Sequence, residues 1–132
     1  MCVFCKIING EIPAFKVYEN DYVVCFLDIN ASSTGHTLVV PKKHIKNMFD
    51  LDEENAIEII KAVKVVTSIL KEKLGVEAVN IINNSGELAG QTVMHIHFHV
   101  IPRYENDGIV ISPKQTEPDF NKLQETLDKL KR

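Results

Sequence analysis

The sequence has no apolar run that approaches the roughly 20 residues needed to span a bilayer, and its first residues lack a basic stretch followed by a long apolar one. We therefore expect no membrane partner and a cytoplasmic location. Lys and Arg are scattered without a basic block, and the formal net charge is −3 at pH 7. This charge pattern disfavours a nucleic-acid partner and favours a small-molecule ligand.

Cysteine is scarce, with only Cys2, Cys5 and Cys25. An odd number of cysteines in a cytoplasmic chain argues against a disulfide framework, because thiols stay reduced in that compartment. Burial or metal binding must explain them instead. Cys25 falls inside a predicted strand and is expected to be buried.

The chain also lacks internal repeats and linker segments. With 132 residues, 45% of them hydrophobic, it is long enough for one domain with a hydrophobic core and too short for two. We expect a single domain over residues 1–132.

Hydrophobic periodicity predicts five strands and two helices. Short alternating or β-branched runs between turn residues indicate strands over 16–19, 23–28, 36–40, 78–82 and 92–101. Apolar residues at helical spacing, between a capping Asp52 and a helix-stopping Gly75, indicate a helix over 53–74. The strands do not alternate regularly with helices, so the expected fold class is α+β: a mostly antiparallel five-stranded sheet with one long central helix and a C-terminal helix.

The C-terminal helix is predicted over residues 119–131. One face of it carries four large apolar side chains at helical spacing: Phe120, Leu123, Leu127 and Leu130. The simplest interpretation is a terminal helix that docks on the domain.

Three of the five histidines of the chain stand at alternate positions, as His95, His97 and His99. Side chains at alternate positions of a strand leave the same face of the sheet, about 6.7 Å apart. An ordinary half-buried strand also alternates, but three histidines in a five-residue window are hard to explain by chance. Because imidazole titrates near neutral pH, binds metals and acts as a nucleophile, this row is the leading candidate for chemistry.

Cys2 and Cys5 have the spacing of two ligands of a tetrahedral zinc site, although a redox pair or simple burial also fits. His44 and His95 are available as the other two ligands. Four protein ligands would close the coordination sphere, so such a zinc would be structural.

If His95 binds metal, His97 and His99 remain for reaction. A neutral imidazole is a competent nucleophile near pH 7 and attacks phosphorus well. The preceding segment, 83–92, must turn the chain back, and it offers backbone N–H groups, an amide and a hydroxyl from Gly86, Gly90, Gln91 and Thr92. Such donors suit phosphate oxygens, although an ordinary glycine turn has the same composition.

The run 95–101 reads His-φ-His-φ-His-φ-φ, where φ is apolar. Together with 26–29, 35–44 and 89–93, it resembles the histidine triad (HIT) family of nucleotide hydrolases and transferases, in its zinc-containing bacterial or archaeal type. The resemblance covers most of residues 2–104. It implies a purine nucleotide substrate that is attacked at the α-phosphate by His97, giving a nucleotidyl-histidine intermediate.

The resemblance implies further roles. His36 would support His97, and Asp28 would hold the ribose hydroxyls. His99 and Asn84 would contact the phosphate or ribose, and Gln91 and Thr92, beside Gly90, would contact the phosphates or leaving group. The base would lie among apolar residues that, without the resemblance, would be assigned to the core: Val3, Phe4, Ile7, Phe26 and Ile29.

The resemblance also supports zinc on Cys2, Cys5, His44 and His95, and it implies a homodimer in which the long helix pairs across a two-fold axis. Ile57 and Val65 lie outside the main apolar face of that helix, which is compatible with a second buried surface.

The expected activity is hydrolysis of nucleoside 5′-phosphoramidates or related conjugates, with dinucleoside polyphosphates as the alternative substrate class. Two other hypotheses stay open. One is a nucleotide-binding regulatory module with little turnover. The other is a metallohydrolase in which all three strand histidines hold a catalytic metal.

Overall fold

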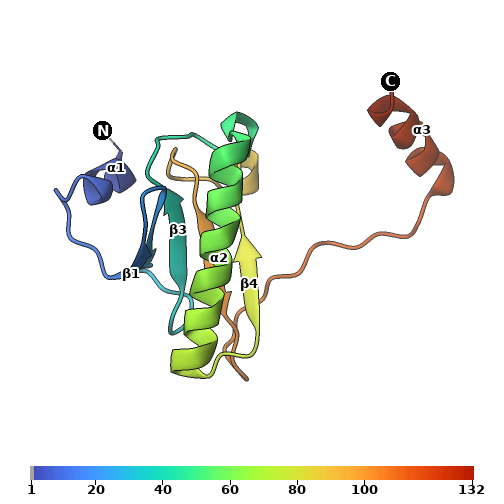
Figure 1. Ribbon diagram of the computed structural model, residues 1–132. Helices are drawn as coiled ribbons and strands as arrows, with labels where there is room; N and C mark the ends of the chain where they lie inside the picture. Colours follow the sequence, from blue (N-terminus) through green and yellow to red (C-terminus); the bar gives the residue numbers. More distant parts are fainter. Residues whose placement is uncertain (1) are drawn as a thin grey trace.

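A computed structural model describes residues 2–132 and contains one five-stranded antiparallel sheet (Figure 1). The strands lie in the order β1-β2-β3-β5-β4, and every neighbouring pair is antiparallel. Their bounds are β1 Lys16–Glu19, β2 Val23–Leu27, β3 Thr37–Pro41, β4 Val79–Ile82 and β5 Phe98–Pro102. The α+β class predicted from the sequence is confirmed.

The long helix α2, Glu53–Leu74, covers one face of the sheet (Figure 1). The Asp52 side chain accepts a hydrogen bond from the backbone N–H of Asn55, and Gly75 ends the helix in the left-handed conformation at φ 69°. Both boundaries agree with the sequence prediction. Ile59 and Val66, fully buried, pack with alternate sheet residues that include Cys25, whose burial raises the pKa of its thiol to about 12.

A short helix, α1 (Val3–Ile8), covers part of the opposite face. Its buried Phe4 and Ile7 pack against the other set of alternate residues in β2 and β3: Val24, Phe26, Leu38 and Val40. Because both faces are covered, β2 and β3 are buried without interruption from Val23 to Phe26 and from Thr37 to Pro41. The sequence did not predict α1, because a helix of six residues is too short to show a helical hydrophobic period.

The last strand begins later than predicted, at Phe98 rather than Thr92. Val39 lies opposite Phe98, so continuing the antiparallel pairing would bring Pro41 opposite Ile96. Pro41 has no N–H to donate to the ladder, and its carbonyl accepts a hydrogen bond from the His95 side chain instead. His97 and His99 still share the sheet face opposite α2, because Phe98 and Val100 pack in the core beneath α2.

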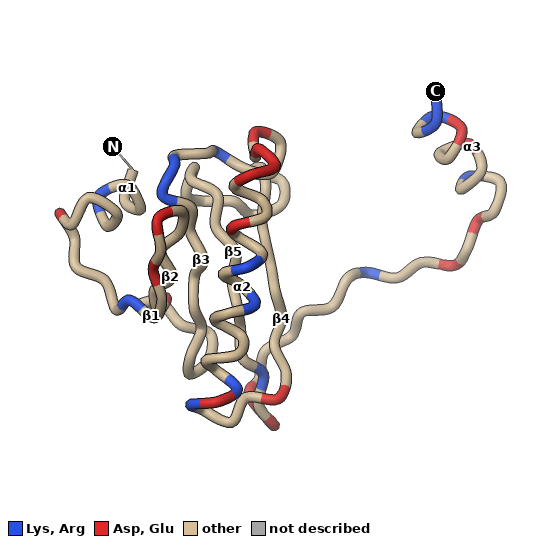
Figure 2. Tube along the Cα trace, viewed as in Figure 1, with Lys and Arg blue, Asp and Glu red and all other residues tan. Residues whose placement is uncertain are grey.

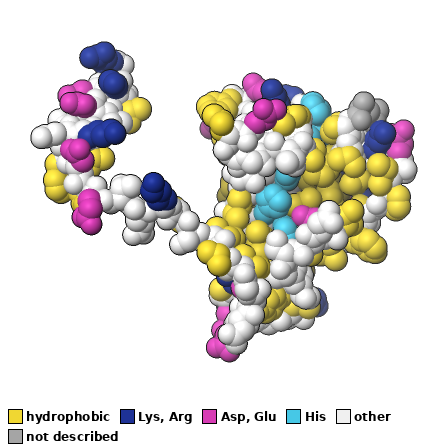
Figure 3. All heavy atoms as spheres, turned by 180° about the vertical axis from the view of Figure 1, so that it is seen from behind, with side chains coloured by type: hydrophobic (Ala, Val, Ile, Leu, Met, Phe, Trp, Pro, Cys, Tyr) yellow, Lys and Arg dark blue, Asp and Glu magenta, His cyan; other side chains and the backbone are white. Residues whose placement is uncertain are grey.

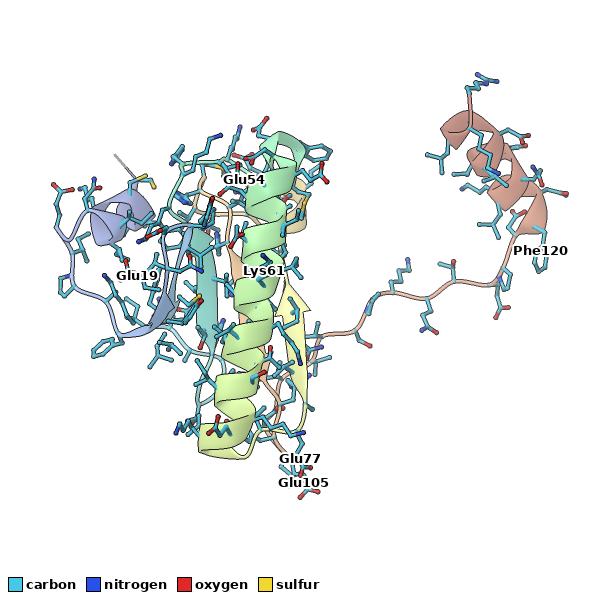
Figure 4. All side chains as sticks on the ribbon, in the orientation of Figure 1. Glu19, Glu54, Lys61, Glu77, Glu105 and Phe120 are labelled. Atoms are coloured by element: carbon cyan, nitrogen blue, oxygen red, sulfur yellow. The ribbon has the colours of Figure 1, made fainter. Side chains whose placement is uncertain are left out.

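The C-terminal helix α3, Phe120–Leu130, does not dock on the domain, so that prediction was wrong. Phe120 and the rest of α3 stand away from the sheet at the end of an extended segment (Figures 1 and 4). All of its residues are exposed, including the four of its apolar face. The 3.6-residue period shows that a helix has an apolar face; it does not show which surface covers that face.

Two short 3-10 helices, Met48–Asp50 (η1) and Glu87–Ala89 (η2), complete the secondary structure. Among residues 2–132 no helix is both long enough and apolar enough to cross a membrane. Lys and Arg are spread over the domain and interleaved with acidic residues (Figure 2).

Candidate functional site

A cavity of about 450 Å³ opens on the sheet face that carries His97 and His99. This volume lies within the range of ligand pockets, which is about 300–1,000 Å³. From behind, the histidine side chains emerge in a hollow bordered by hydrophobic side chains (Figure 3). The structure brings nearly all of the predicted ligand-binding residues to this cavity: Val3, Phe4, Ile7, Phe26, Asp28, Ile29, Asn84, Gly90, Gln91, Thr92, His97 and His99.

Hydrogen bonding decides which nitrogen of His97 is free. Nδ1 of His97 lies 2.8 Å from the carbonyl oxygen of His95. A carbonyl only accepts, so Nδ1 carries the proton and donates it. In the neutral ring Nε2 then holds an unshared electron pair, and His97 is available as a nucleophile at Nε2.

A chain of hydrogen bonds sets the tautomer of His99 through His36. The backbone N–H of Ser32 donates to Nδ1 of His36 at 3.0 Å, so His36 carries its proton on Nε2. That Nε2 lies 2.9 Å from Nδ1 of His99, which therefore accepts. His99 in turn carries its proton on Nε2, where it is a donor suited to an anionic oxygen.

Burial keeps both of these histidines neutral. Burial and the neighbouring His97 and His36 lower the pKa of His99 to about 4. Burial also lowers the pKa of His36, opposed by the charge of Asp28, whose Oδ2 lies 3.6 Å from His36 Nε2. Asp28 also accepts from the backbone N–H of Asn30 at 2.8 Å, which fixes its carboxylate at the cavity wall.

The loop between β4 and β5 borders the cavity beside His97. Gln91 is 4% exposed, and its side chain is engaged within the protein: it accepts from Gly86 N–H at 2.8 Å and donates to the carbonyls of Lys46 and Val93. Gly90 has φ 93°, a conformation that favours glycine. Thr92, in contrast, is exposed where it lines the cavity.

Sequence reasoning missed Asn83, which donates from Nδ2 to the backbone carbonyl of His97 at 3.0 Å. Its only sequence signal is a polar residue directly after the predicted strand 78–82. Sequence reasoning also missed the cavity wall formed by the segment between α1 and β1, which includes Ile12, Pro13 and Phe15.

The four predicted metal ligands converge near the N-terminal end of α1, as expected: Cys2, Cys5, His44 and His95. The two sulfurs lie 3.1 Å apart, as do the two Nδ1 atoms, and each sulfur lies 3.3 or 3.6 Å from each Nδ1. For zinc bonds of about 2.3 Å to sulfur and about 2.0 Å to nitrogen, the edges of the tetrahedron are about 3.3–3.8 Å long. The four donors therefore lie close to the corners of a zinc tetrahedron.

The chemistry of this donor set also fits a cation. Nε2 of His95 donates to the Pro41 carbonyl at 2.8 Å, which leaves an electron pair on Nδ1, facing Nδ1 of His44. Burial, followed by the hydrogen bond and charge of Cys2, raises the pKa of the Cys5 thiol. As thiolates, the two sulfurs would repel each other and the two nitrogen electron pairs at these distances, so a cation between the four donors would favour the deprotonated form that binds metal.

The three histidines of the row therefore do not share one metal. His95 belongs to the cysteine group, whereas His99 forms a second group with Asp28 and His36. His97 belongs to neither group among the residues that the structure describes. The geometry favours separate roles over a three-histidine catalytic metal site.

A second hollow, of about 950 Å³, lies over the outer side of α2 and contains no histidine. Its walls are the side chains of Tyr18 and Asn20 and of α2 residues from Glu53 to Val65, including Ile57 and Ile60. Although it is larger, it is a shallow groove, and none of the predicted catalytic or ligand-binding residues lines it.

Comparison with known proteins identifies the family, because a model described as "HIT domain" matches residues 9–106. The chain belongs to the HIT family. An uncharacterized HIT-like protein of Methanocaldococcus jannaschii is 56% identical over 84% of this chain and 85% of its own length. The adenosine 5′-monophosphoramidase of Saccharomyces cerevisiae is 38% identical over 92% of this chain and 75% of its own.

Solved structures agree with this assignment. A structure from Streptococcus mutans superposes with a TM-score of 0.94 at 40% identity and covers 98% of this chain and 83% of its own. A zinc-bound histidine triad family protein of Mycobacterium smegmatis has a TM-score of 0.79 at 34% identity, with 98% and 95% covered. The family match includes the residues from His36 to His99. It begins at residue 9, after α1, so it does not include Cys2 and Cys5.

Proposed function

We propose that this HIT protein is a nucleotidyl hydrolase that cleaves nucleoside 5′-phosphoramidates or related nucleotide conjugates at the α-phosphate. The carrying observation is the hydrogen bond from His97 Nδ1 to the His95 carbonyl, which leaves Nε2 as the nucleophile in a cavity of nucleotide size. The phosphoramidase named in yeast supports this substrate class.

In the proposed reaction, Nε2 of His97 attacks the α-phosphorus and a P–N bond to the ring forms as the bond to the leaving amine breaks. The amine leaves with the bond's electron pair and takes a proton from solvent. Nδ1–H stays on the ring and donates to the His95 carbonyl, which stabilises the positive charge of the nucleotidyl-imidazole. Water then attacks phosphorus, releases a proton and returns the electron pair to Nε2.

The surrounding residues would bind the rest of the nucleotide. The Nε2–H of His99 would donate to a phosphate oxygen, and Asn84, Gly90 and Thr92 border the same region. The Asp28 carboxylate would accept from the ribose hydroxyls. Gln91 would act mainly by bracing the loop, since its amide is already hydrogen bonded. The base would stack among Phe4, Ile7, Phe26 and Ile29.

We further propose that Cys2, Cys5, His44 and His95 hold a structural zinc ion. Their geometry and the zinc-bound relative support this assignment. When bound, zinc would neutralise the two thiolates and fix α1 to the sheet. Four protein donors leave no open position, so the proposed reaction does not pass through the metal.

We propose a homodimer in the cytoplasm, formed through the outer side of α2. The groove there is mainly apolar, and Ile57 and Ile60 are 49% and 57% exposed. Large exposed apolar side chains on one helix face are typical of a subunit interface.

The direct test is intact-mass analysis of protein quenched during turnover with adenosine 5′-phosphoramidate or with diadenosine polyphosphates. We expect an adduct of one nucleoside monophosphate on the wild type and none on His97→Ala, which should lose activity by about 10⁴-fold or more. Phe49→Ala, on the exposed η1, is the control and should react normally. Unchanged nucleotide release by His97→Ala would refute the mechanism.

The panel also separates the alternatives. Faster trapping from diadenosine polyphosphates would favour the polyphosphate hydrolase, and tight AMP binding with negligible cleavage of every donor would favour a regulatory binding module.

A further inference from the structure

The helix α1 contributes to two sites at once. Cys2, its capping residue, and Cys5 belong to the metal-ligand group, while Phe4 and Ile7 form part of the nucleotide cavity. The two sets alternate along one six-residue helix. A displacement of α1 would therefore change both sites together.

Phe4 lies between the two sites. Its ring is 6% exposed and packs edge-on against His97, with centroids 5.0 Å apart and planes at 78°. It packs in the same way against His95, at 5.8 Å and 79°, and against Phe26, at 5.7 Å. One side chain thus contacts a metal ligand, the proposed nucleophile and the base pocket.

The helix is too short to hold this position unaided. Isolated helices shorter than about 12 residues are marginal in water. Two things fix α1: the burial of Phe4 and Ile7 against β2 and β3, and the contacts of Cys2 and Cys5 with His44 and His95. Without a metal, only weak thiol–imidazole hydrogen bonds link these four side chains, so the apolar contacts carry most of the attachment of α1.

We propose that metal binding and nucleotide binding are coupled through α1, with Phe4 as the positioning residue that transmits the coupling to His97. The proposal rests on the nucleotide and zinc sites proposed above. With the metal bound, α1 closes the base pocket and holds the His97 ring; without it, α1 loosens and the pocket loses a wall. Because binding free energies are reciprocal, the nucleotide must in turn tighten metal binding by the same factor.

A purely structural zinc far from the cavity would behave differently. It would stabilise the domain against unfolding, but AMP would not slow its release from the folded protein. Reciprocity therefore distinguishes coupling through α1 from general stabilisation.

The test measures AMP affinity by calorimetry for zinc-loaded and metal-free protein, and zinc release to a chromogenic chelator with and without saturating AMP. We expect about tenfold weaker AMP binding without zinc and a similar slowing of zinc release by AMP, within the usual range of coupling. The zinc-release arm uses loaded wild-type protein, so it holds even if the metal-free chain unfolds.

Phe4→Leu should keep zinc but reduce the AMP effect on zinc release to less than about twofold. Phe15→Leu is the matched control: Phe15 lines the same cavity from outside α1 and is 70% exposed. It should weaken AMP binding yet leave the coupling at the wild-type value.

Equal AMP affinity with and without zinc, zinc release that ignores AMP, or full coupling in Phe4→Leu would each overturn the inference. Zinc-loaded protein that does not bind AMP at all would refute the proposed function as well, whereas AMP binding without coupling would refute only the role of α1.

Discussion

Carbonyl oxygens beside His95 and His97 decide which ring nitrogen carries a proton. Each oxygen accepts from the histidine, so the opposite nitrogen is left with an electron pair: Nδ1 in His95 and Nε2 in His97. His99 has the same tautomer as His95, with the proton on Nε2, because His36 donates to its Nδ1. Under the proposed function, three neighbouring imidazoles of one sequence pattern would thus serve as a metal ligand, a nucleophile and a donor.

The depressed pKa of His99 predicts how stability varies with pH. Its folded pKa, about 4, lies below the ordinary value of 6.5, so between these values the unfolded chain binds a proton that the native chain does not. Stability should therefore fall as the pH is lowered from about 6.5 towards 4, and His36 acts in the same direction. Urea unfolding at a series of pH values measures this loss.

His99→Gln serves as the comparison, because loss of the proposed zinc at low pH would affect both proteins. The variant should lose stability less steeply over this interval, and in NMR spectra the wild-type His99 ring should stay neutral down to about pH 5. Identical pH dependence in the two proteins would contradict the assignment.

Asn83 offers a second prediction at this scale. Its Nδ2 donates to the His97 carbonyl, and replacing Asn83 by Ala removes this hydrogen bond, worth about 0.5–1.5 kcal/mol, together with the one that Asn83 Oδ1 accepts from Ser85. We expect Asn83→Ala to lower kcat by about three- to tenfold with little change in KM, because the contact orients the nucleophile. Steady-state kinetics measures this effect. Asn121→Ala, on the exposed α3, should have none, and a KM effect alone would instead place Asn83 in substrate binding.

The spacing of Cys2 and Cys5, with His44 and His95 available, indicated the four metal-ligand candidates, and the family resemblance indicated most of the residues that line the cavity. The sequence was not sufficient for the tautomers. These depend on where the Pro41 and His95 carbonyls and the Ser32 N–H lie after folding, and no spacing in the sequence contains that information.

At the scale of elements, capping and periodicity predicted α2 to the residue, because Asp52 and Gly75 mark its ends. They failed for α1, which is held by side chains distant in sequence, and for the start of β5, which depends on Pro41 in another strand. They also failed for the docking of α3. Local patterns predict an element well when its boundaries are set locally.

Replacing either of two glycines near α2 by alanine should lower the free energy of unfolding, but by different amounts. Gly75 has φ 69°, and a Cβ there meets nothing within 4 Å, so Gly75→Ala should cost only the left-handed conformation, about 1–2 kcal/mol. At Gly35, φ is 95°, and a Cβ would lie 3.0 Å from Leu70 Cδ2 and 3.2 Å from Pro102 Cγ. Overpacking adds about 1–3 kcal/mol there. In urea denaturation, Gly35→Ala should therefore be clearly less stable than Gly75→Ala. Equal losses of stability would show that the side chains around Gly35 move aside freely.

At the scale of the whole molecule, the two faces of the sheet hold different features. The side opposite α2 carries the cavity and the metal-ligand group, and α2 supplies the core on the other side (Figures 1 and 3). The outer surface of α2 faces away from the sheet, with Lys61 at its exposed side (Figure 4). A partner bound there would leave the cavity entrance free.

Dimer formation through the outer surface of α2 can be tested without disturbing the core. Ile60 is 57% exposed and lines the groove, so Ile60→Glu should leave the thermal unfolding of the subunit largely unchanged while placing a charge in the interface. Because burying an unpaired charge is costly, we expect the variant to sediment as a monomer at concentrations where the wild type is a dimer. Phe49→Glu also places a charge at an exposed apolar residue, 88% exposed and outside the groove, and should remain dimeric. If Ile60→Glu also sediments as a dimer, the interface lies elsewhere, and the exposed Ile57 and Ile60 need another explanation.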